Sequence, residues 1–407
     1  MPTGSSKSPR SLPEHPNLRH LKDQAKALLK AGQAVSLTEA QLNIARMYGF
    51  PSWRGLKAHV DEVNLGKDVI ELKQAIDGND FDRVKLLMTR NPALHRAPMG
   101  YGKNGPLTWV AECRVPWEPP TPARLAMAQW MIDNGSDVHQ GGDGPLMRAA
   151  LRDDRIPMME LLVRNGANVN AEWGGFFPII FAPCESLAPG SLRWLVDHGA
   201  NSDCARAGRQ YPETALDYVI GTYARSERLG ACIDILVEAG CPARRNIPAV
   251  LEILRGRVDK LREHLDADAA LVNRRFGELD FGNTGNRSMT LRGGTLLHVA
   301  AEYGNVEAAR LLLDRGADVD VRADLDETGV GGQTPIFHAV SQFFDFGLPM
   351  AEFLVARGAD LSISAKVPGH YERPGELVEC TPLEYARLFP GEENKTTTFL
   401  QKAGAPE

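Results

Sequence analysis

Apolar and polar positions along this chain follow the 3.6-residue period of short amphipathic helices. The pattern is clearest in residues 293–320, where a short apolar stretch precedes a second, longer apolar helix. The apolar face of the second helix consists of Val306, Ala309, Leu312 and Leu313. Two short helices expose more apolar surface than they can bury against each other, so this pair is predicted to stack on similar units.

Start and stop signals frame both helices of this segment. Thr295 and Asn305 each precede an apolar run and are suited to the N-cap position, where a side-chain oxygen accepts a backbone N–H. Gly304 and Gly316 follow the two runs, where glycine readily adopts the positive φ that ends a helix. The segment therefore predicts one compact helix pair.

The end of the second helix recurs along the chain as an apolar pair, a spacer, a glycine and a small residue. The glycines of this pattern are Gly135, Gly166, Gly199, Gly240, Gly316, Gly358 and Gly404. The first two gaps (135 to 166 and 166 to 199) are 31 and 33 residues, whereas the gap from 240 to 316 is 76 residues. The long gap holds two enlarged units, so a degenerate copy lacking the Gly-Ala ending is predicted near 247–273.

The first helix of each unit begins with its own recurring motif. The clear copies are TLLHVA (295–300), TPIFHA (334–339) and TPLEYA (381–386), and the weaker ones are GPLTWVA (105–111), GPLMRAA (144–150), FPIIFA (177–182) and ETALDYV (213–219). In motif and period the chain resembles the ankyrin repeat family, and residues 293–320 match that consensus nearly throughout. The resemblance implies an all-α solenoid of about nine helix pairs, with hairpin fingers projecting between the pairs.

The region before the repeats has a different character. Residues 1–11 are rich in Gly, Ser and Pro and are predicted to be disordered, and residues 12–64 predict three helices. This leader resembles the helical segment that precedes the repeats of some bacterial ankyrin-type proteins. We expect it to cap the first repeat, although its basic face offers an alternative role in partner binding. That face consists of Arg19, Lys22, Lys26 and Lys30.

The remaining chain divides into repeats 1–6 at 65–275 and repeats 7–9 at 276–407. Length beyond the repeat period must lie in the connections, and the longest are 274–293, 321–332 and 364–380. The resemblance to ankyrin repeats implies that these connections are consecutive finger loops. We expect them to lie beside each other and to build one wall or one pocket.

Composition narrows the classes of partner. The chain of 407 residues has a formal net charge of −6, which gives no electrostatic footprint for nucleic acid. The six cysteines form no C-x-x-C pair and predict reduced thiols in a cytoplasmic protein. No apolar run is long enough for a membrane span, so we expect no membrane association.

The signature histidine of the best repeat, His298, is predicted to hydrogen-bond backbone groups of neighbouring repeats. The equivalent position in the other copies varies in chemistry, so no repeating metal site is expected there. The glycine-rich 329–332 segment is followed by no G-K-[ST] and predicts a hairpin turn rather than a phosphate loop. Asp324, Asp326 and Glu327 lack the spacing of a calcium loop and are interpreted as a solvated finger.

The segment 369–374 concentrates an imidazole, a phenol, a carboxylate and a guanidinium in one loop. Such a mixture suits polar recognition of a partner, or acid–base chemistry in a dehydrated pocket, and recognition is favoured. Aromatic residues of the connections are candidate anchors for a partner, with packing between fingers as the alternative: Trp173, Phe176, Phe177, Phe276, Phe281 and Tyr371.

These features favour a protein–protein interaction scaffold that binds through its concave face and fingers. No catalytic residue, metal or cofactor is predicted. The residues expected to border the functional surface are Phe281, Arg287, Asp324, His338, His370, Tyr371 and Arg373. The alternative is a small-molecule-binding or enzymatic pocket under the fingers at 274–380. A closed cavity lined by Asp324, His338, His370 and Arg373 would favour that pocket.

Overall fold

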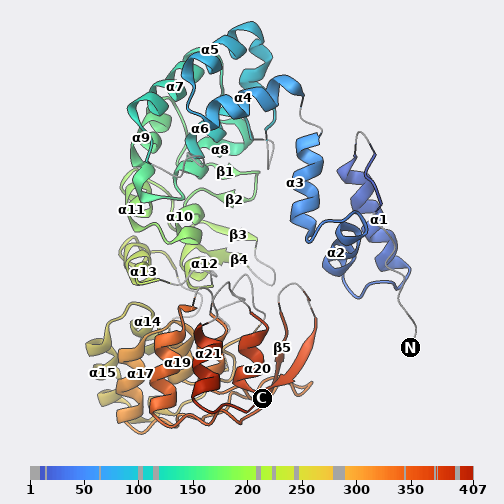
Figure 1. Ribbon diagram of the computed structural model, residues 1–407. Coiled ribbons are helices and arrows are strands. Elements are labelled where there is room, and N and C mark those ends of the chain that lie inside the picture. Colours follow the sequence, from blue (N-terminus) through green and yellow to red (C-terminus); the bar gives the residue numbers. More distant parts are fainter. Residues whose placement is uncertain are drawn as a thin grey trace. The chain divides into compact units, whose positions relative to one another are not determined.

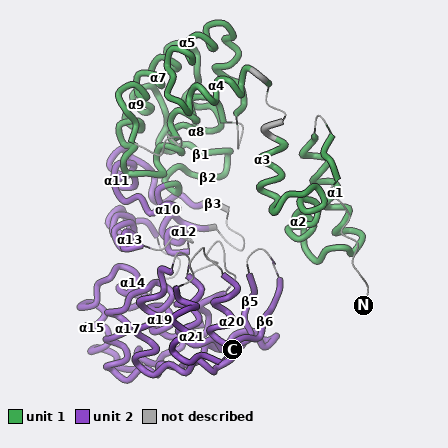
Figure 2. The backbone as a smooth tube through the Cα atoms, in the orientation of Figure 1, with its two compact units in different colours: residues 1–182 green, residues 183–407 purple. Residues whose placement is uncertain are grey.

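The computed structural model describes most of the chain, and its elements are drawn in Figure 1. The described residues are 10–13, 16–63, 66–99, 104–112, 119–207, 212–221, 226–242, 247–277, 289–342, 345–370, 373, 375–389 and 395–406. The chain forms two compact units, residues 1–182 and 183–407 (Figure 2). Within the described ranges, no helix combines the length and apolar character needed to cross a bilayer.

The leader folds as the three helices predicted: α1 (Leu18–Lys30), α2 (Leu37–Met47) and α3 (Trp53–Val63). Asn17 caps α1 through its side chain, and Ser36 does the same for α2. The three helices enclose a small core of their own, which includes Leu21, Ile44 and Leu56. The proposed role of the leader as a cap on the first repeat stays a prediction.

The first unit continues with three helix pairs. The pairs are α4 (Lys67–Asp77) with α5 (Phe81–Arg90), α6 (Pro106–Glu112) with α7 (Pro122–Asp133), and α8 (Gln140–Ala149) with α9 (Ile156–Arg164). Two 3₁₀ segments cover Pro92–Arg96 and Asp153–Arg155. The first helices of successive pairs contact each other, α4 with α6 and α6 with α8, and the second helices form a parallel layer through α5, α7 and α9.

The second unit contains most of the remaining repeats. Its pairs are α10 (Phe181–Ser186, which begins in the first unit) with α11 (Pro189–Asp197), α12 (Ala215–Gly221) with α13 (Arg228–Glu238), α14 (Pro248–Leu254) with α15 (Val258–Ala267), α16 (Leu296–Glu302) with α17 (Val306–Asp314), α18 (Pro335–Val340) with α19 (Leu348–Ala356), and α20 (Pro382–Arg387) with α21 (Lys395–Lys402). A 3₁₀ turn covers Ala269–Val272. The helices again form two layers, one through α14, α16, α18 and α20 and the other through α15, α17, α19 and α21. The second of these layers is labelled in Figure 1. The described residues thus hold nine helix pairs, as predicted, and the fold is an all-α repeat array.

The glycine signals are confirmed at every predicted position. The seven glycines that end the second helices all have positive φ, from +75° at Gly240 to +114° at Gly135. In the best repeat the N–H that follows the glycine closes the helix, because Ala317 donates to the carbonyl of Leu312 at 2.9 Å. Thr295 and Asn305 occupy the N-cap positions of α16 and α17 as expected.

One predicted helix start is wrong. The motif FPIIFA was assigned to the first helix of its repeat, but α10 begins only at Phe181. Phe177 and Pro178 form β2, which pairs with β1 (Glu172–Trp173) in an antiparallel hairpin. The ring of Phe177 packs at 6.3 Å from Trp173 and at 5.8 Å from Phe181, so aromatic packing holds this segment extended. Packing, rather than partner anchoring, is therefore the role of Phe177.

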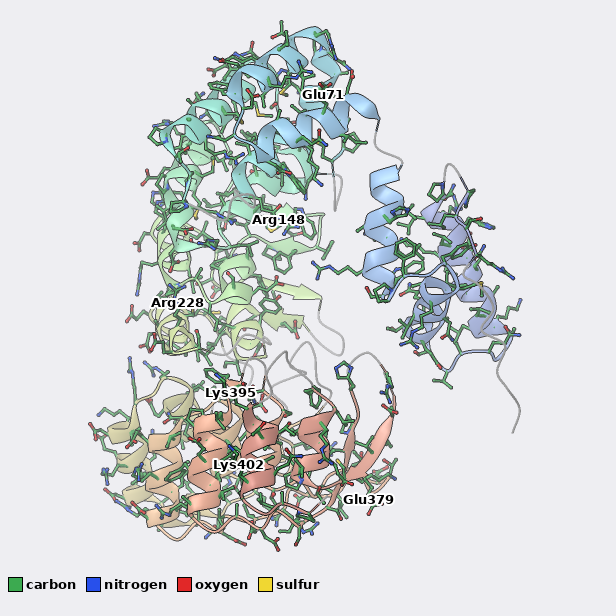
Figure 3. All side chains as sticks on the ribbon, in the orientation of Figure 1. Glu71, Arg148, Arg228, Glu379, Lys395 and Lys402 are labelled. Atoms are coloured by element: carbon green, nitrogen blue, oxygen red, sulfur yellow. The ribbon has the colours of Figure 1, made fainter. Side chains whose placement is uncertain are left out.

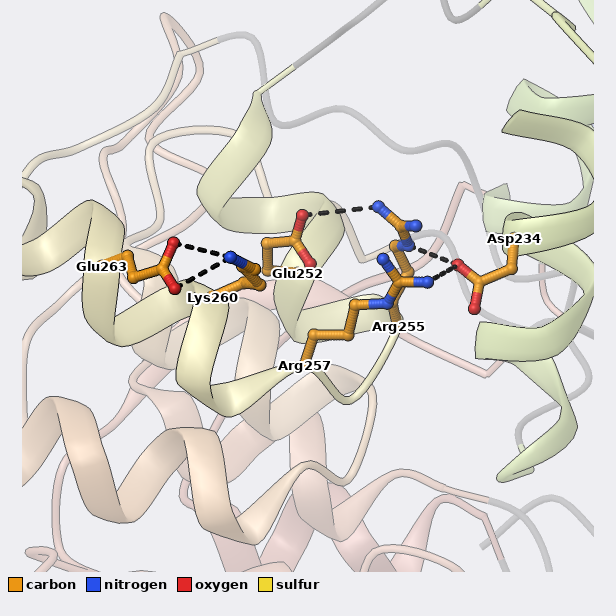
Figure 4. A network of polar contacts seen from close by, with 6 residues as sticks. All are labelled: Asp234, Glu252, Arg255, Arg257, Lys260 and Glu263. Atoms are coloured by element: carbon orange, nitrogen blue, oxygen red, sulfur yellow. Dashed lines mark hydrogen bonds and ion pairs between the residues drawn. The ribbon is translucent and has the colours of Figure 1, made fainter. Parts of the chain in front are cut away.

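The predicted degenerate repeat is present as α14 and α15, and polar contacts attach it to the preceding repeat (Figure 4). Arg255, between the two helices, lies 2.5 Å from Asp234 of α13, and Arg257 lies 2.9 Å from the same carboxylate. A Cβ on Gly230 of α13 would approach the carbonyl oxygen of Arg255 to 2.9 Å. Ion pairing and close backbone approach thus join the degenerate repeat to the preceding one.

Candidate functional site

His298 links two consecutive repeats, as predicted. The backbone N–H of Thr295 donates to its Nδ1 at 3.0 Å, so Nε2 carries the proton and donates to the carbonyl of Gln333 at 3.1 Å. The side chain is fully buried. Burial, together with the adjacent His338, lowers the pKa of His298 to about 3. The ring is therefore neutral at physiological pH and serves as a fixed hydrogen-bonding group.

His338 was expected to border the functional surface, but it lies inside the array. It belongs to α18 and is 1% exposed. Its Nδ1 lies 2.9 Å from a carboxylate oxygen of Glu302 on α16, and its ring packs edge-on against His298 with 5.7 Å between centroids. The buried carboxylate on the preceding repeat explains this inward position, because a buried polar ring needs a hydrogen-bonding partner.

The same acid–base pairing occurs in the first unit. Glu112 and Arg148 occupy the positions in α6 and α8 that Glu302 and His338 occupy in α16 and α18, and their charged groups lie 3.8 Å apart. Arg148 is labelled in Figure 3. These pairs were not predicted from the sequence. An alignment of the motifs GPLTWVAE, GPLMRAA, TLLHVAAE and TPIFHAV nevertheless places an acid and a base at matching positions.

His298→Ala is expected to lower the free energy of unfolding by about 1–3 kcal/mol, because the N–H of Thr295 and the carbonyl of Gln333 lose a buried partner. The measurement is urea denaturation at neutral pH. Binding by the still-folded variant should stay close to wild type. Full stability combined with lost binding would contradict the structural role of this histidine.

The long connections of repeats 7–9 lie beside each other and are hydrogen-bonded in chain order. The N–H of Phe276 donates to the carbonyl of Gly294 at 2.9 Å within the first finger. The second finger joins the first where the backbone N–H of Asp324 donates to the carbonyl of Gly293 at 3.2 Å. The third joins the second where the backbone N–H of Gly331 donates to the carbonyl of Lys366 at 2.8 Å. The described parts of the three connections are therefore joined into one ribbon of backbone segments.

The outermost part of this ribbon is a regular hairpin. β5 (Ala365–Pro368) and β6 (Leu377–Cys380) are antiparallel, with Lys366 opposite Glu379 and Pro368 opposite Leu377. Ala365, Val367 and Cys380 on the inner face are buried, whereas Leu377 on the other face is 46% exposed. Burial also raises the pKa of the Cys380 thiol to about 12, so it is not a reactive thiolate at neutral pH.

The exposed side of the hairpin continues onto the second finger. Leu325 lies opposite Gly331, and Gly331 lies opposite Lys366, so Leu325 faces the same side as Lys366. Leu325 is 64% exposed. We call this side the outer finger face and define it by Leu325, Lys366, Pro368, Leu377 and Glu379.

The acidic second finger is a hydrogen-bonded turn. The carboxylate of Asp326 accepts the N–H of Thr328 at 2.7 Å and that of Val330 at 3.0 Å. The hydrogen bond from the Thr328 hydroxyl, together with these two backbone bonds, lowers the pKa of Asp326. The predicted hairpin turn at 329–332 is confirmed by the bridge between Leu325 and Gly331. Among the described residues, no three His, Cys, Asp or Glu side chains gather as a metal site.

The other predicted site residues are spread over the fingers. Asp324 is exposed and lies 3.0 Å from Arg275, and Arg373, 63% exposed, lies 3.0 Å from Glu376. His370 packs its ring 5.4 Å from that of Phe389. Phe281, Arg287 and Tyr371 lie outside the described residues. Phe276, a candidate anchor, is fully buried and therefore packs within the array, whereas Phe176 is exposed.

The described helix pairs stack in two layers, and seven of the nine second helices end at a glycine with positive φ. This arrangement defines a helical-repeat protein. Comparison with family models identifies the repeats. Ankyrin repeats in three copies match residues 264–365, and a single ankyrin repeat matches residues 141–172. The chain therefore contains ankyrin repeats. A search of curated proteins gave no match.

Proposed function

We propose that the protein is a recognition scaffold that binds a protein partner through the outer finger face. Ankyrin repeats generally mediate protein–protein interaction. The observation that carries the proposal is the ribbon itself, in which three consecutive fingers are hydrogen-bonded into a supported surface with two exposed leucines, Leu325 and Leu377. Binding sites commonly lie on loops that a rigid scaffold positions. Asp324, His370 and Arg373 lie on the same fingers and are proposed to border this surface.

The alternative of a pocket under the fingers has no support among the described residues. A pocket required Asp324, His338, His370 and Arg373 to converge. His338 is instead buried against Glu302, while Asp324 and Arg373 pair with separate partners at exposed positions. The proposal therefore concerns recognition of a partner, and the cytoplasmic location stays a prediction.

The test begins with capture of a partner from native lysate by the full chain, followed by titration of the purified partner. We expect Leu325→Ser combined with Leu377→Ser to weaken binding by about 2 kcal/mol, or roughly 30-fold, because burying these apolar side chains against the partner stabilises the complex. The melting temperature should change little, since both side chains are exposed.

Two controls make the result specific. Leu86 on α5 is 55% exposed and belongs to the first unit, so Leu86→Ser removes a comparable apolar side chain outside the fingers and is expected to leave binding unchanged. Changing Lys22, Lys26 and Lys30 together to Gln should also leave binding intact. Loss of binding in the lysine variant, with the finger variant unaffected, would move the site to the leader.

A further inference from the structure

We infer that the free edge of β6 accepts an extended, basic segment of the protein partner as an added strand. The inference rests on the proposed function, because it specifies how a partner engages the fingers. Strand addition draws affinity from backbone hydrogen bonds and specificity from alternate side chains. Three features of the hairpin lead to it: the direction of its backbone groups, the charge of its edge and the alternation of its faces.

The register shows which backbone groups of β6 point outward. Beyond the strand ends, the N–H of Gly369 donates to the carbonyl of Glu376 at 2.8 Å, so these two residues form a hydrogen-bonded pair. Such pairs alternate with non-bonded pairs in an antiparallel ladder, which makes Lys366 and Glu379 a non-bonded pair. The hydrogen bond from the N–H of Gly331 to the carbonyl of Lys366 supports this register, because it shows that this carbonyl points away from β6.

It follows that Leu377 and Glu379 direct their N–H and C=O groups away from β5. No residue in the described part of the chain hydrogen-bonds to these four groups. The next outward N–H, that of Thr381, is already taken by the carboxylate of Glu384 at 2.7 Å. The free edge therefore offers two donors and two acceptors at the spacing of one short added strand. Figure 3 labels Glu379 on this strand.

Charge selects a basic occupant. Glu379 is exposed and makes no ion pair with any described residue, since Lys366 opposite it donates instead to the carbonyl of Thr328 at 3.3 Å. Glu376 and Glu384 flank the edge, with Arg373 the cation paired there. A lysine or arginine on the added strand beside Glu379 would supply the missing partner, and complementary charge favours specific association.

The faces of β6 define the alternation of the added strand. Glu379 and Leu377 lie on the outer face, whereas Val378 and Cys380 lie on the inner face. A segment with basic residues on one face and apolar residues on the other would match Glu379 on the outer face and Val378 on the inner face. A second copy of this chain does not, because the antiparallel pairing of two such edges that uses all four groups sets Glu379 opposite Leu377 and supplies no basic residue beside it.

The experiment uses the full chain and a defined probe, a fluorescein-labelled acetyl-Lys-Val-Lys-Val-Lys-Val-amide peptide, with the Glu-Val counterpart as its control. We expect the Lys-Val peptide to bind about tenfold or more tightly than the Glu-Val peptide. Binding should slow hydrogen exchange at the amides of Leu377 and Glu379. Equal binding of both peptides, or protection elsewhere, would overturn the inference.

A set of variants separates strand addition from surface charge. Glu379→Lys should reverse the peptide preference, whereas Glu352→Lys, an equal charge change at an exposed site on α19, should not. Glu379→Gln removes only the charge and should weaken binding, whereas Glu379→Pro removes the charge and an outward N–H and should abolish binding while the melting temperature is retained. Equal effects of the two lysine variants would show a nonspecific charge effect. Self-association of the wild type that Glu379→Pro abolishes would identify a second copy as the occupant, and both outcomes contradict the inference.

Failure here is distinguishable from failure of the proposed function. If the captured partner requires Leu325 and Leu377 but is indifferent to Glu379→Pro, the finger face is the site and strand addition is wrong. If the partner ignores the two leucines, the proposed function itself fails.

Discussion

Acidification from pH 7 to pH 4 is expected to cost the second unit about 3 kcal/mol of unfolding free energy through His298 alone. The folded-state pKa is lowered to about 3 from 6.5, so the unfolded chain binds an additional proton between these values. The contribution of this histidine is fully present above pH 6.5 and is lost progressively as the pH falls toward 3. Protonation would require Nδ1, which accepts the N–H of Thr295, to become a donor.

The measurement is hydrogen exchange of the α16 amides across this pH range. His298→Gln removes the titrating group and should flatten the pH dependence, although it starts from a lower stability. His139 provides the control, because its hydrogen bond to Asp143 raises its pKa. Its contribution is present below pH 6.5 and is lost as the pH rises through the raised value. His139→Gln should therefore keep the acid sensitivity of α16, and an unchanged slope in His298→Gln would contradict the assignment.

Glu302→Leu is expected to lower the free energy of unfolding by about 3–5 kcal/mol, because it removes one member of a pair buried on both sides. The imidazole of His338 would lose the carboxylate that faces it at 2.9 Å. Urea denaturation at neutral pH measures the loss. Removing both partners, in Glu302→Leu combined with His338→Leu, should recover much of it, since an apolar pair carries no desolvation cost.

The equivalent pair in the first unit is the matched control. Glu112 and Arg148 are farther apart, at 3.8 Å, and the Arg148 side chain is 23% exposed, so Glu112→Leu should cost less than Glu302→Leu. A double variant no more stable than Glu302→Leu alone would show that the loss comes from packing rather than from the pair.

The repeat architecture was predictable because its signals are local. Gly316 ends α17 through its own φ, and Thr295 occupies the N-cap position of α16, so each can be inferred from a few neighbouring residues. The degenerate repeat at 247–273 followed from spacing alone. The late start of α10 was missed because the aromatic contacts of Phe177 outweigh the motif that it belongs to.

The finger surface was predictable only in outline. Loop length indicated that three fingers are neighbours, but the bonds that join them run between backbone groups and leave no mark on residue type. The interior position of His338 was missed for a related reason. Its partner Glu302 is 36 residues earlier, so a pattern confined to one repeat does not contain it.

The hydrogen bonds between fingers also bear on how this part of the molecule deforms. In an array of stacked helix pairs, each interface acts as a compliant joint, and small rotations at successive joints add up to bending. The bonds from Asp324 to Gly293 and from Gly331 to Lys366 cross two such joints away from the helix contacts. Because they act at a distance from the pivot, a small rotation stretches them disproportionately. Repeats 7–9 are therefore expected to resist bending more than repeats whose connections are not hydrogen-bonded to each other.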